Sequence, residues 1–489
     1  MNHIKKLAGQ TAVYGLGVVI PRLMSYLVLT PFYTRIFNKS EYGIITELYA
    51  YVVFLIVILT YGLETGFFRF AEDSRNKDDV YKTALISITS TTLLWFGIIF
   101  LFYRNFAGVL DYNNFPRYIL WLGLIVGLDA FTAIPLARIR LENRPLKYSI
   151  IRVFEVLVNL FFNWFFILYC HEHYEESEWI SKIYNPEIRV GYAFVSNLIA
   201  SILKLLLLSK EIFDIRGRFN WKLWKDIMIY SLPLLVAGLA GTVNEALDRV
   251  LLKHMISPPL IPLEEVGVYG ANFKLAVLMT LFIQMFRYAA EPFFFSQMNQ
   301  TNAKSIYADV MKYFVFAAFG IFLGVMLFID IFKLFIGEEF REAIAIVPII
   351  LIANIFMGIY YNLSVWFKLT NKTRYGAYMV LVGAGLTILI NVMFIPKYSY
   401  VASAWGHFAA YLVMIVMSFI LGRKFYSVNY QLKRISLYAG IALIIFFVFR
   451  GIELPNLFIE YSLKTLALIF YVIIFALNEN LLKLKNLST

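Results

Sequence analysis

The sequence lacks most of the residues and motifs that mark enzymes and metal sites. It has one cysteine, Cys170, so no internal disulfide can form and redox chemistry is not expected. It has no H-E-x-x-H, no Cys/His cluster, no Walker loop and no G-x-S-x-G in its usual context. We therefore expect no enzymatic activity, no metal and no cofactor.

Charged residues are also scarce. They make up 16% of the chain, against 60% hydrophobic residues, and the mean hydropathy is +0.70. This composition excludes an ordinary soluble domain and predicts a polytopic membrane protein. The cations behind the net charge of +12 lie mostly in short loops between apolar runs, where they set topology. We expect no nucleic-acid partner.

Fourteen runs are apolar and long enough to cross a bilayer, which takes about 20 residues. Lipid offers no partner to backbone N–H and C=O groups, so each run is expected to be a helix and the fold all-α. The predicted spans lie at roughly residues 11–37, 44–64, 82–103, 118–137, 149–169, 190–209, 226–252, 266–290, 313–336, 343–367, 375–395, 399–422, 435–450 and 460–477.

The loops predict an orientation. When they are assigned alternately to two sides, about 26 Lys or Arg fall on the side of Met1 and about 11 on the other. This excess predicts that Met1 and Thr489 both face the cytoplasm. The longest loop on the opposite side, residues 171–189, is acidic and too short to be a domain.

Two stretches 224 residues apart look alike. Residues 41–44 (Glu-Tyr-Gly-Ile) open the second span, and residues 265–268 (Glu-Val-Gly-Val) open the eighth. The first and seventh spans carry Pro21 and Pro233, which allow a helix to bend. Six helices per copy predict two pseudo-symmetric lobes related by an axis along the membrane normal. The expected parts are an N-terminal lobe at 1–209, a basic cytoplasmic linker at 210–225, a C-terminal lobe at 226–424, and two extra helices with a cytoplasmic tail at 425–489.

Cations inside the spans are strong functional signals, because each costs roughly 2.5 to 3.5 kcal/mol near the bilayer centre. Arg22 lies in a run without acids; it either faces water or a ligand, or snorkels or donates to a carbonyl freed by a kink. Lys274 either contacts a ligand or pairs with a carboxylate of a neighbouring helix. Arg152 is three residues before Glu155, which favours a plain intrahelical pair.

Acidic residues in or at the ends of spans form a second group. Glu245 and Arg249 are four residues apart and can pair, and Asp248 shares a face with Glu245. This cluster is either a structural feature of the outer interface or a cation-coupling site. His407 is expected to bond between helices rather than to bind a metal. The candidates for ion coupling or gating are Glu47, Glu64, Asp129, Glu245, Asp248, Arg287 and Glu291.

Several short segments carry a family resemblance. Together with fourteen spans and duplicated lobes, they resemble the Wzx-type polysaccharide transporters of the multidrug/oligosaccharidyl-lipid/polysaccharide (MOP) exporter superfamily. The segments are Tyr-Gly-Leu-Gly at 14–17, Pro-Arg at 21–22, Pro-Phe-Tyr-Thr-Arg at 31–35, Glu-Tyr-Gly at 41–43 and Tyr-Gly-Leu-Glu-Thr at 61–65, with weaker similarities at 231–233, 248–249 and 266–269.

The resemblance implies that the protein moves a polyprenyl-pyrophosphate-linked oligosaccharide across a bacterial inner membrane. Related lipid flippases use a cationic central cavity with an arginine on the first helix, and Arg22 matches that position. The substrate-binding candidates are therefore Arg22, with Lys274, Arg249 and Arg152 in support. The implied partners are the lipid-linked oligosaccharide, membrane lipids, and a polysaccharide polymerase with its chain-length machinery. Na⁺ or H⁺ coupling stays open.

Three alternatives stand beside this prediction. A multidrug cation/H⁺ or Na⁺ antiporter of the same superfamily needs acids in the first lobe, where the first span has Arg22 instead. A peptidoglycan-precursor flippase is not excluded by the charge argument. A membrane polysaccharide polymerase or ligase is expected to display a large basic outer loop, and the longest one here is short and acidic.

Overall fold

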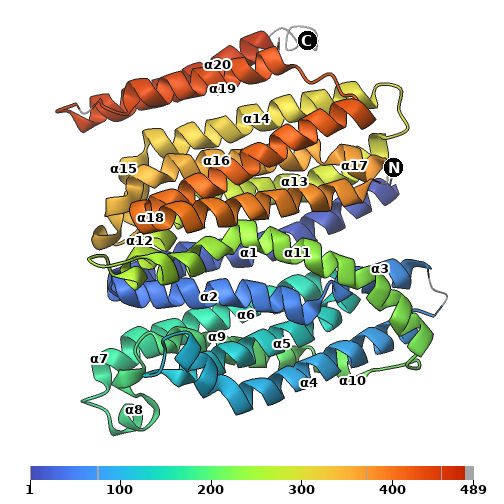
Figure 1. Ribbon diagram of the computed structural model, residues 1–489, viewed down its shortest axis with the longest axis vertical. Helices are drawn as coiled ribbons and strands as arrows, with labels where there is room; N and C mark the ends of the chain where they lie inside the picture. The colour runs from blue at the N-terminus through green and yellow to red at the C-terminus, as the bar shows by residue number, and fades with distance from the viewer. Residues whose placement is uncertain (1, 74–75, 371, 453, 480–489) are drawn as a thin grey trace. The chain divides into compact units, whose positions relative to one another are not determined.

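The computed structural model describes residues 2–73, 76–370, 372–452 and 454–479, and all regular structure in these ranges is helical (Figure 1). The predicted all-α class is confirmed. By compactness the chain divides into two units. Unit 1 comprises Met1–His254 and Pro258–Gly267, and unit 2 comprises Met255–Ser257 and Val268–Thr489. The lobe boundaries drawn from the sequence repeat stay predictions.

Helices account for both units. The elements that lie in or begin in unit 1 are α1 (Asn2–Ile36), α2 (Lys39–Thr60), α3 (Leu63–Asp73), α4 (Lys77–Val109), α5 (Pro116–Leu141), α6 (Pro145–Asn163), the π-helix η1 (Trp164–Cys170), α7 (His171–His173), α8 (Glu178–Ile183), the 3₁₀ turn η2 (Pro186–Ile188), α9 (Gly191–Leu207), α10 (Ser209–Phe213), α11 (Trp221–Met255) and α12 (Pro262–Leu275). Those of unit 2 are α13 (Val277–Gln297), α14 (Ala303–Leu327), α15 (Ile329–Phe332), the 3₁₀ elements η3 (Lys333–Phe335) and η4 (Glu338–Ile346), α16 (Val347–Leu363), α17 (Val365–Leu369), α18 (Thr373–Phe425), α19 (Leu432–Phe449) and α20 (Leu457–Asn478).

Ten helical segments among the described residues are long and apolar enough to cross a membrane, or eleven if α12 and α13, bent by 53°, count as one span. The number of fourteen stays a prediction. The other candidates are α1, the 17-residue α9 and the second half of α18. α18 joins two predicted spans in one 53-residue element, and Ser399, at φ 47°, interrupts its helical backbone.

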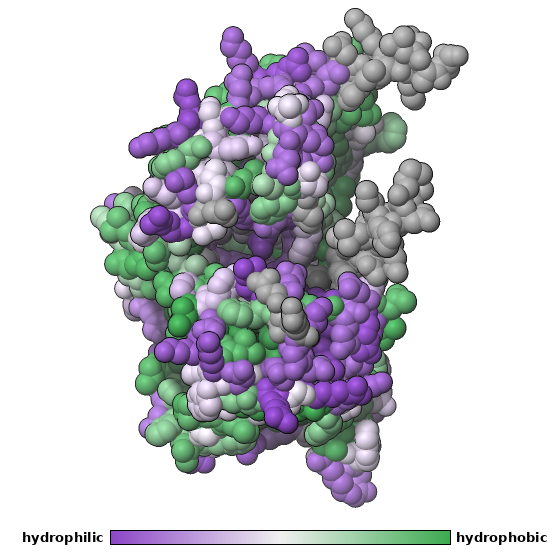
Figure 2. Space-filling view, turned by 90° about the vertical axis from the view of Figure 1, so that its right-hand side faces the viewer, coloured by the Kyte–Doolittle hydropathy of each residue, from purple (hydrophilic) through white to green (hydrophobic). Residues whose placement is uncertain are grey.

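The surface agrees with a membrane protein. Large hydrophobic side chains are exposed along the helices; Leu101 and Val109 on α4 are both 75% exposed. Figure 2 shows the side of the chain that lies on the right of Figure 1, where hydrophilic residues are exposed among hydrophobic ones. Long helices with exposed apolar side chains are what a bilayer requires. The protein is therefore a multi-pass membrane protein.

Local sequence signals set the boundaries of α2. Asn38 and Glu41 form a capping box at its start, in which each side chain accepts a hydrogen bond from the other residue's backbone N–H. At its end Tyr61 and Gly62 adopt left-handed φ angles of 37° and 71°. These two residues stop α2 and restart the chain as α3, because a left-handed residue terminates a helix.

The starts of α2 and α12 contact each other through a reciprocal pair of glycines. A Cβ atom on Gly43 would collide with the carbonyl oxygen of Leu263, and one on Gly267 would collide with the carbonyl oxygen of Lys39. Gly43 and Gly267 are 224 residues apart, and so are the residues that they contact, Lys39 and Leu263. The two similar stretches found in the sequence are separated by the same 224 residues. The two similar segments thus approach each other backbone to backbone, which only glycine permits.

We expect Gly43→Ala to destabilise the protein by about 1 to 3 kcal/mol or more, because the added methyl group has no space beside a backbone carbonyl. The measurement is thermal unfolding of purified protein in detergent. Gly97→Ala is the matched control, since a Cβ at Gly97 on α4 meets nothing within 4 Å. Equal melting temperatures for the two variants would show that the glycine contact is not tight.

Candidate functional site

Four charged side chains form an ion network inside unit 1. Lys204 on α9 places Nζ 2.6 Å from Oδ1 of Asp129 on α5 and 2.7 Å from Oε1 of Glu155 on α6. Arg152, one turn before Glu155, binds the other carboxylate oxygen, Oε2, at 2.8 Å. Ser201 donates to Asp129 Oδ1 at 2.9 Å. The predicted Arg152–Glu155 pair is present, and Lys204 connects it to Asp129.

α1 packs along α6 and positions Arg22. Near the start of the contact, Gly17 lies so close to Ser149 that a Cβ would collide with its side chain. Near its end, the Tyr33 hydroxyl donates to Asn163 Oδ1 at 2.6 Å. The contact later in α1 is also the one later in α6, so the two helices run parallel. This pairing of the two helices places Arg22, which is exposed, at about the same level along α6 as Arg152 and Glu155 of the ion network.

Glu47 is fully buried in α2 and is held by groups from two other parts of unit 1. The Tyr112 hydroxyl donates to its Oε2, and Lys253 at the end of α11 forms an ion pair with the same oxygen at 3.1 Å. Lys253 also donates to the carbonyl of Leu110 at 2.5 Å and lies 4.1 Å from the centre of the Tyr112 ring. This arrangement fixes the end of α11 to α2.

Glu64, at the start of α3, pairs with Arg140 near the end of α5. The Arg140 guanidinium also lies 4.9 Å from the centre of the Phe68 ring and 5.7 Å from that of Tyr148. A guanidinium over aromatic faces gains cation–π attraction in addition to its ion pair. Arg140 therefore connects α5 to α3 and α6 at this end of the unit.

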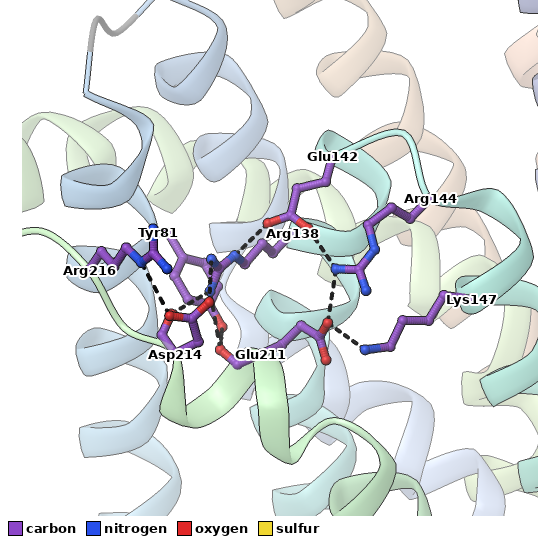
Figure 3. Close-up of polar contacts among 8 residues, drawn as sticks. All are labelled: Tyr81, Arg138, Glu142, Arg144, Lys147, Glu211, Asp214 and Arg216. Atoms are coloured by element: carbon purple, nitrogen blue, oxygen red, sulfur yellow. Dashed lines mark hydrogen bonds and ion pairs between the residues drawn. The ribbon is translucent and has the colours of Figure 1, made fainter.

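The turn between α5 and α6 binds α10 through a network of charges (Figure 3). Glu211 of α10, whose side chain is 2% exposed, accepts from Lys147 at 2.6 Å and from Arg144 at 3.1 Å. Arg138 donates to the carbonyl of Asp214 at 2.8 Å. Burial opposes ionisation of Glu142, but hydrogen bonds from Arg144 and Arg138 outweigh it and lower the pKa of Glu142.

The segment between α9 and α11 is therefore fastened to unit 1. Besides the α10 contacts, Lys82 donates to the carbonyl of Gly217 at 3.0 Å, and Asp79 accepts from the backbone N–H of Arg218 at 2.6 Å. The basic linker predicted at 210–225 is thus an ordered part of this unit, and its last residues already belong to α11.

The seventh predicted span carries its charges near the end of α11. Arg249 lies 3.3 Å from an oxygen of the adjacent Asp248 and donates to the backbone carbonyl of Glu245 at 2.6 Å. Arg249 thus reaches the main chain of Glu245, whereas the sequence spacing allowed a side-chain pair. Asp248 is buried, and Glu245 is exposed.

Three of the predicted site residues, Lys274, Arg287 and Glu291, lie in unit 2. Lys274 is exposed one residue before the end of α12, beside the bend into α13. Glu291 on α13 pairs with Lys368 at 2.8 Å. The guanidinium of Arg287, one turn earlier, lies 5.1 Å from the centre of the Tyr361 ring. These last side chains rim a small pocket between α13 and α16–α17.

Sequence reasoning missed four lysines that form ion pairs and whose side chains are at most 8% exposed. Two are the partners of Asp129 and Glu47 described above. The other two lie in unit 2: Lys312 pairs with Glu479 at 2.5 Å, and Lys464 pairs with Glu460 at 2.5 Å. The sequence does mark these lysines, because each lies inside an apolar run or directly beside one end of it. Among the described residues, no group of three or more His, Cys, Asp or Glu could hold a metal ion.

Comparisons with known proteins place the chain in a family. Residues 7–298, or 292 of 489, match the family described as polysaccharide biosynthesis protein. A search of curated protein sequences found no match. Among solved structures, the chain is similar to the lipid II flippase MurJ in an inward closed conformation, with a TM-score of 0.70 and 14% identity over 96% of this chain and 99% of that one.

Two further similarities are to multidrug transporters. An inward-facing multidrug resistance MATE family transporter of the MOP superfamily gives a TM-score of 0.62 and 13% identity over 86% of this chain and 96% of that one. An outward-facing conformation of a transporter of the same description gives a TM-score of 0.57 and 14% identity over 85% and 93%. The fold expected from the resemblance, that of the MOP superfamily, is confirmed. Because the family match covers more than half of the chain, the protein belongs to the polysaccharide biosynthesis protein family, with the fold of the MOP superfamily.

Proposed function

We propose that this protein flips a polyprenyl-pyrophosphate-linked oligosaccharide, a repeat unit of O-antigen, capsule or exopolysaccharide, from the inner to the outer leaflet of a bacterial inner membrane. Transport proceeds by alternating access of two lobes. The observation that carries the proposal is Arg22, an exposed cation within α1 in a chain of the polysaccharide biosynthesis family. A lipid flippase among its structural relatives supports the same class of cargo.

Arginine fits this cargo chemically. Its planar guanidinium donates two parallel hydrogen bonds to a phosphate group, which a lysine ammonium cannot reproduce. Arg22 binds the pyrophosphate, and the exposed Lys274 adds positive charge on α12. Arg152 and Arg249 contribute less, because both already contact acidic residues. The polyprenyl chain stays in lipid during the crossing.

The membrane potential assists this direction of transport. A pyrophosphate carries about two negative charges, and each gains about 2.3 kcal/mol when it moves outward across 100 mV, inside negative. The total of about 4 to 5 kcal/mol favours export without ATP. In this orientation both termini and the ion network of Figure 3 are cytoplasmic, and the released cargo passes to a polysaccharide polymerase with its chain-length machinery.

The remaining acids serve as ion-pair partners or gating elements. Glu47 and Glu64 connect helices of unit 1, and Glu291 pairs with Lys368 in unit 2. Asp248 pairs with Arg249 on α11, Arg249 also donates to the backbone carbonyl of Glu245, and Arg287 contacts an aromatic ring. We assign the gating role to these residues and phosphate binding to the cations above.

The test is flipping in proteoliposomes. The probe is a fluorescent, short-chain polyprenyl-pyrophosphate trisaccharide, and its outer-leaflet fraction is read by chemical quenching. We expect the protein to speed translocation well above protein-free vesicles. Lipid II is the matched comparison, because similarity to MurJ makes a peptidoglycan-precursor flippase the second candidate. Transport of lipid II alone, or of a cationic dye alone, would contradict the proposal.

A potential applied across the same vesicles gives a second expectation. Valinomycin with a potassium gradient that makes the interior negative should raise the outer-leaflet fraction at equilibrium, because the cargo is an anion. The opposite gradient should lower it. Movement in the reverse sense would mean that more positive than negative charge crosses with the cargo.

A further inference from the structure

The ion network of α5, α6 and α9 has a feature that phosphate binding does not use. Its centre is a cation surrounded by oxygen atoms from other helices. Lys204 Nζ lies 2.6 Å from Asp129 Oδ1 and 2.7 Å from Glu155 Oε1. Ser201, one turn before Lys204, donates its hydroxyl hydrogen to the same Asp129 oxygen at 2.9 Å. Oxygen ligands from separate helices are also what a bound metal cation would require.

The two cations of the network differ in burial. The side chain of Lys204 is 2% exposed, whereas that of Arg152 is 36% exposed. Arg152 binds Oε2 of Glu155. Of these two cations, only Lys204 forms ion pairs with both carboxylates. Removing the lysine charge would leave two carboxylates facing one vacant position: Asp129, whose side chain is 29% exposed, and Glu155, which is 13% exposed and still paired with Arg152. Repulsion between two close carboxylates favours the uptake of a proton or a cation.

Grouped carboxylates inside transporters commonly carry ions or protons. Here the positive charge is part of the chain. A tethered ammonium competes with free ions at a high effective concentration, so a free cation cannot displace it at ordinary concentrations. We infer that Lys204 is a built-in counter-cation, which fills a monovalent-cation site between Asp129 and Glu155. Unit 1 consequently needs no free Na⁺ at these acids, whatever cargo the protein carries.

The inference is tested by thermal unfolding of the full-length protein in detergent at pH 8. Melting temperatures are compared in NaCl and in choline chloride at equal ionic strength. We expect wild-type protein to melt at the same temperature in both salts. Lys204→Ala should melt lower in choline chloride and regain stability as NaCl rises, with a saturable shift of several degrees, because the ion binds only the folded state.

Two further variants separate a cation site from a general salt effect. Lys204→Ala combined with Asp129→Asn removes one of the two ligands and should lose the sodium response. Lys204→Arg keeps the charge and should resemble wild type in showing no response. A folded Lys204→Ala variant that melts identically in both salts would overturn the inference.

If Lys204→Ala fails to fold, the melting temperatures of wild type and Asp129→Asn in the two salts still test the inference. A sodium-specific rise in the melting temperature of the wild type that Asp129→Asn abolishes would mean that a free cation binds here beside the lysine, and would overturn the inference. No sodium response in either protein supports it. None of these measurements depends on flipping, so their outcome is separate from that of the proposed function.

Discussion

Arg22→Ala is expected to lower the rate of flipping by about 10- to 100-fold, with little change in melting temperature. The loss corresponds to one charge-assisted interaction with the pyrophosphate, worth about 1.5 to 3 kcal/mol. Stability should hold because the arginine is exposed on α1 and is not part of the packed interior. The measurement is the proteoliposome assay with the polyprenyl-pyrophosphate trisaccharide.

Two variants sharpen this expectation. Arg22→Lys keeps the charge but loses the bidentate geometry, so its rate should fall between those of wild type and Arg22→Ala. Arg35→Ala removes another exposed arginine of the same helix, in its last turn, and should leave the rate close to wild type. Full activity of Arg22→Ala at normal expression would remove Arg22 from the proposed site.

Glu47→Ala is expected to destabilise the protein by about 3 to 5 kcal/mol, the largest stability effect that we predict. Glu47 is fully buried, and the side chain of its partner Lys253 is 8% exposed. Truncating the acid leaves a buried ammonium without its counter-charge. Thermal unfolding in detergent should show a clear drop, together with reduced yield of folded protein.

Removal of both charges is the control for this result. Glu47→Gln combined with Lys253→Met should recover most of the lost stability, because no uncompensated charge remains. Tyr112→Phe removes only the hydroxyl that donates to Glu47 and should cost about 0.5 to 1.5 kcal/mol more than a surface change. A double variant as unstable as Glu47→Ala would mean that packing, rather than charge pairing, accounts for the loss.

Composition and local pattern were sufficient for the fold class. Apolar runs of about 20 residues are a property of contiguous sequence, so most helices fall where they were expected. Breaks that depend on backbone geometry were not predictable to the residue. Tyr61 and Gly62 divide one predicted span into α2 and α3, and Ser399 interrupts α18 without separating it into two elements.

The candidate site could be predicted only in part. Arg22, Arg152 and Asp129 attract attention because charges are rare in spans, and that signal is local. Their partners are set by the fold: Lys204 is 75 residues from Asp129 and 49 from Glu155 in sequence. No spacing rule on a single helix reaches that far, since helical neighbours are three or four residues apart. The same limit hid the partner of Glu47.

The fastening of residues 208–220 to unit 1 has a mechanical consequence. A segment bonded to α4 and to the α5–α6 turn at several points cannot serve as a slack tether between the two halves of the chain. We therefore expect bending to occur within a helix rather than in this segment. α11 begins directly after this segment and contains Pro233, which breaks the backbone hydrogen-bond ladder about three turns from the start. Pro233 lies between the two attached ends of α11, so we expect any bending of this helix to concentrate at the proline.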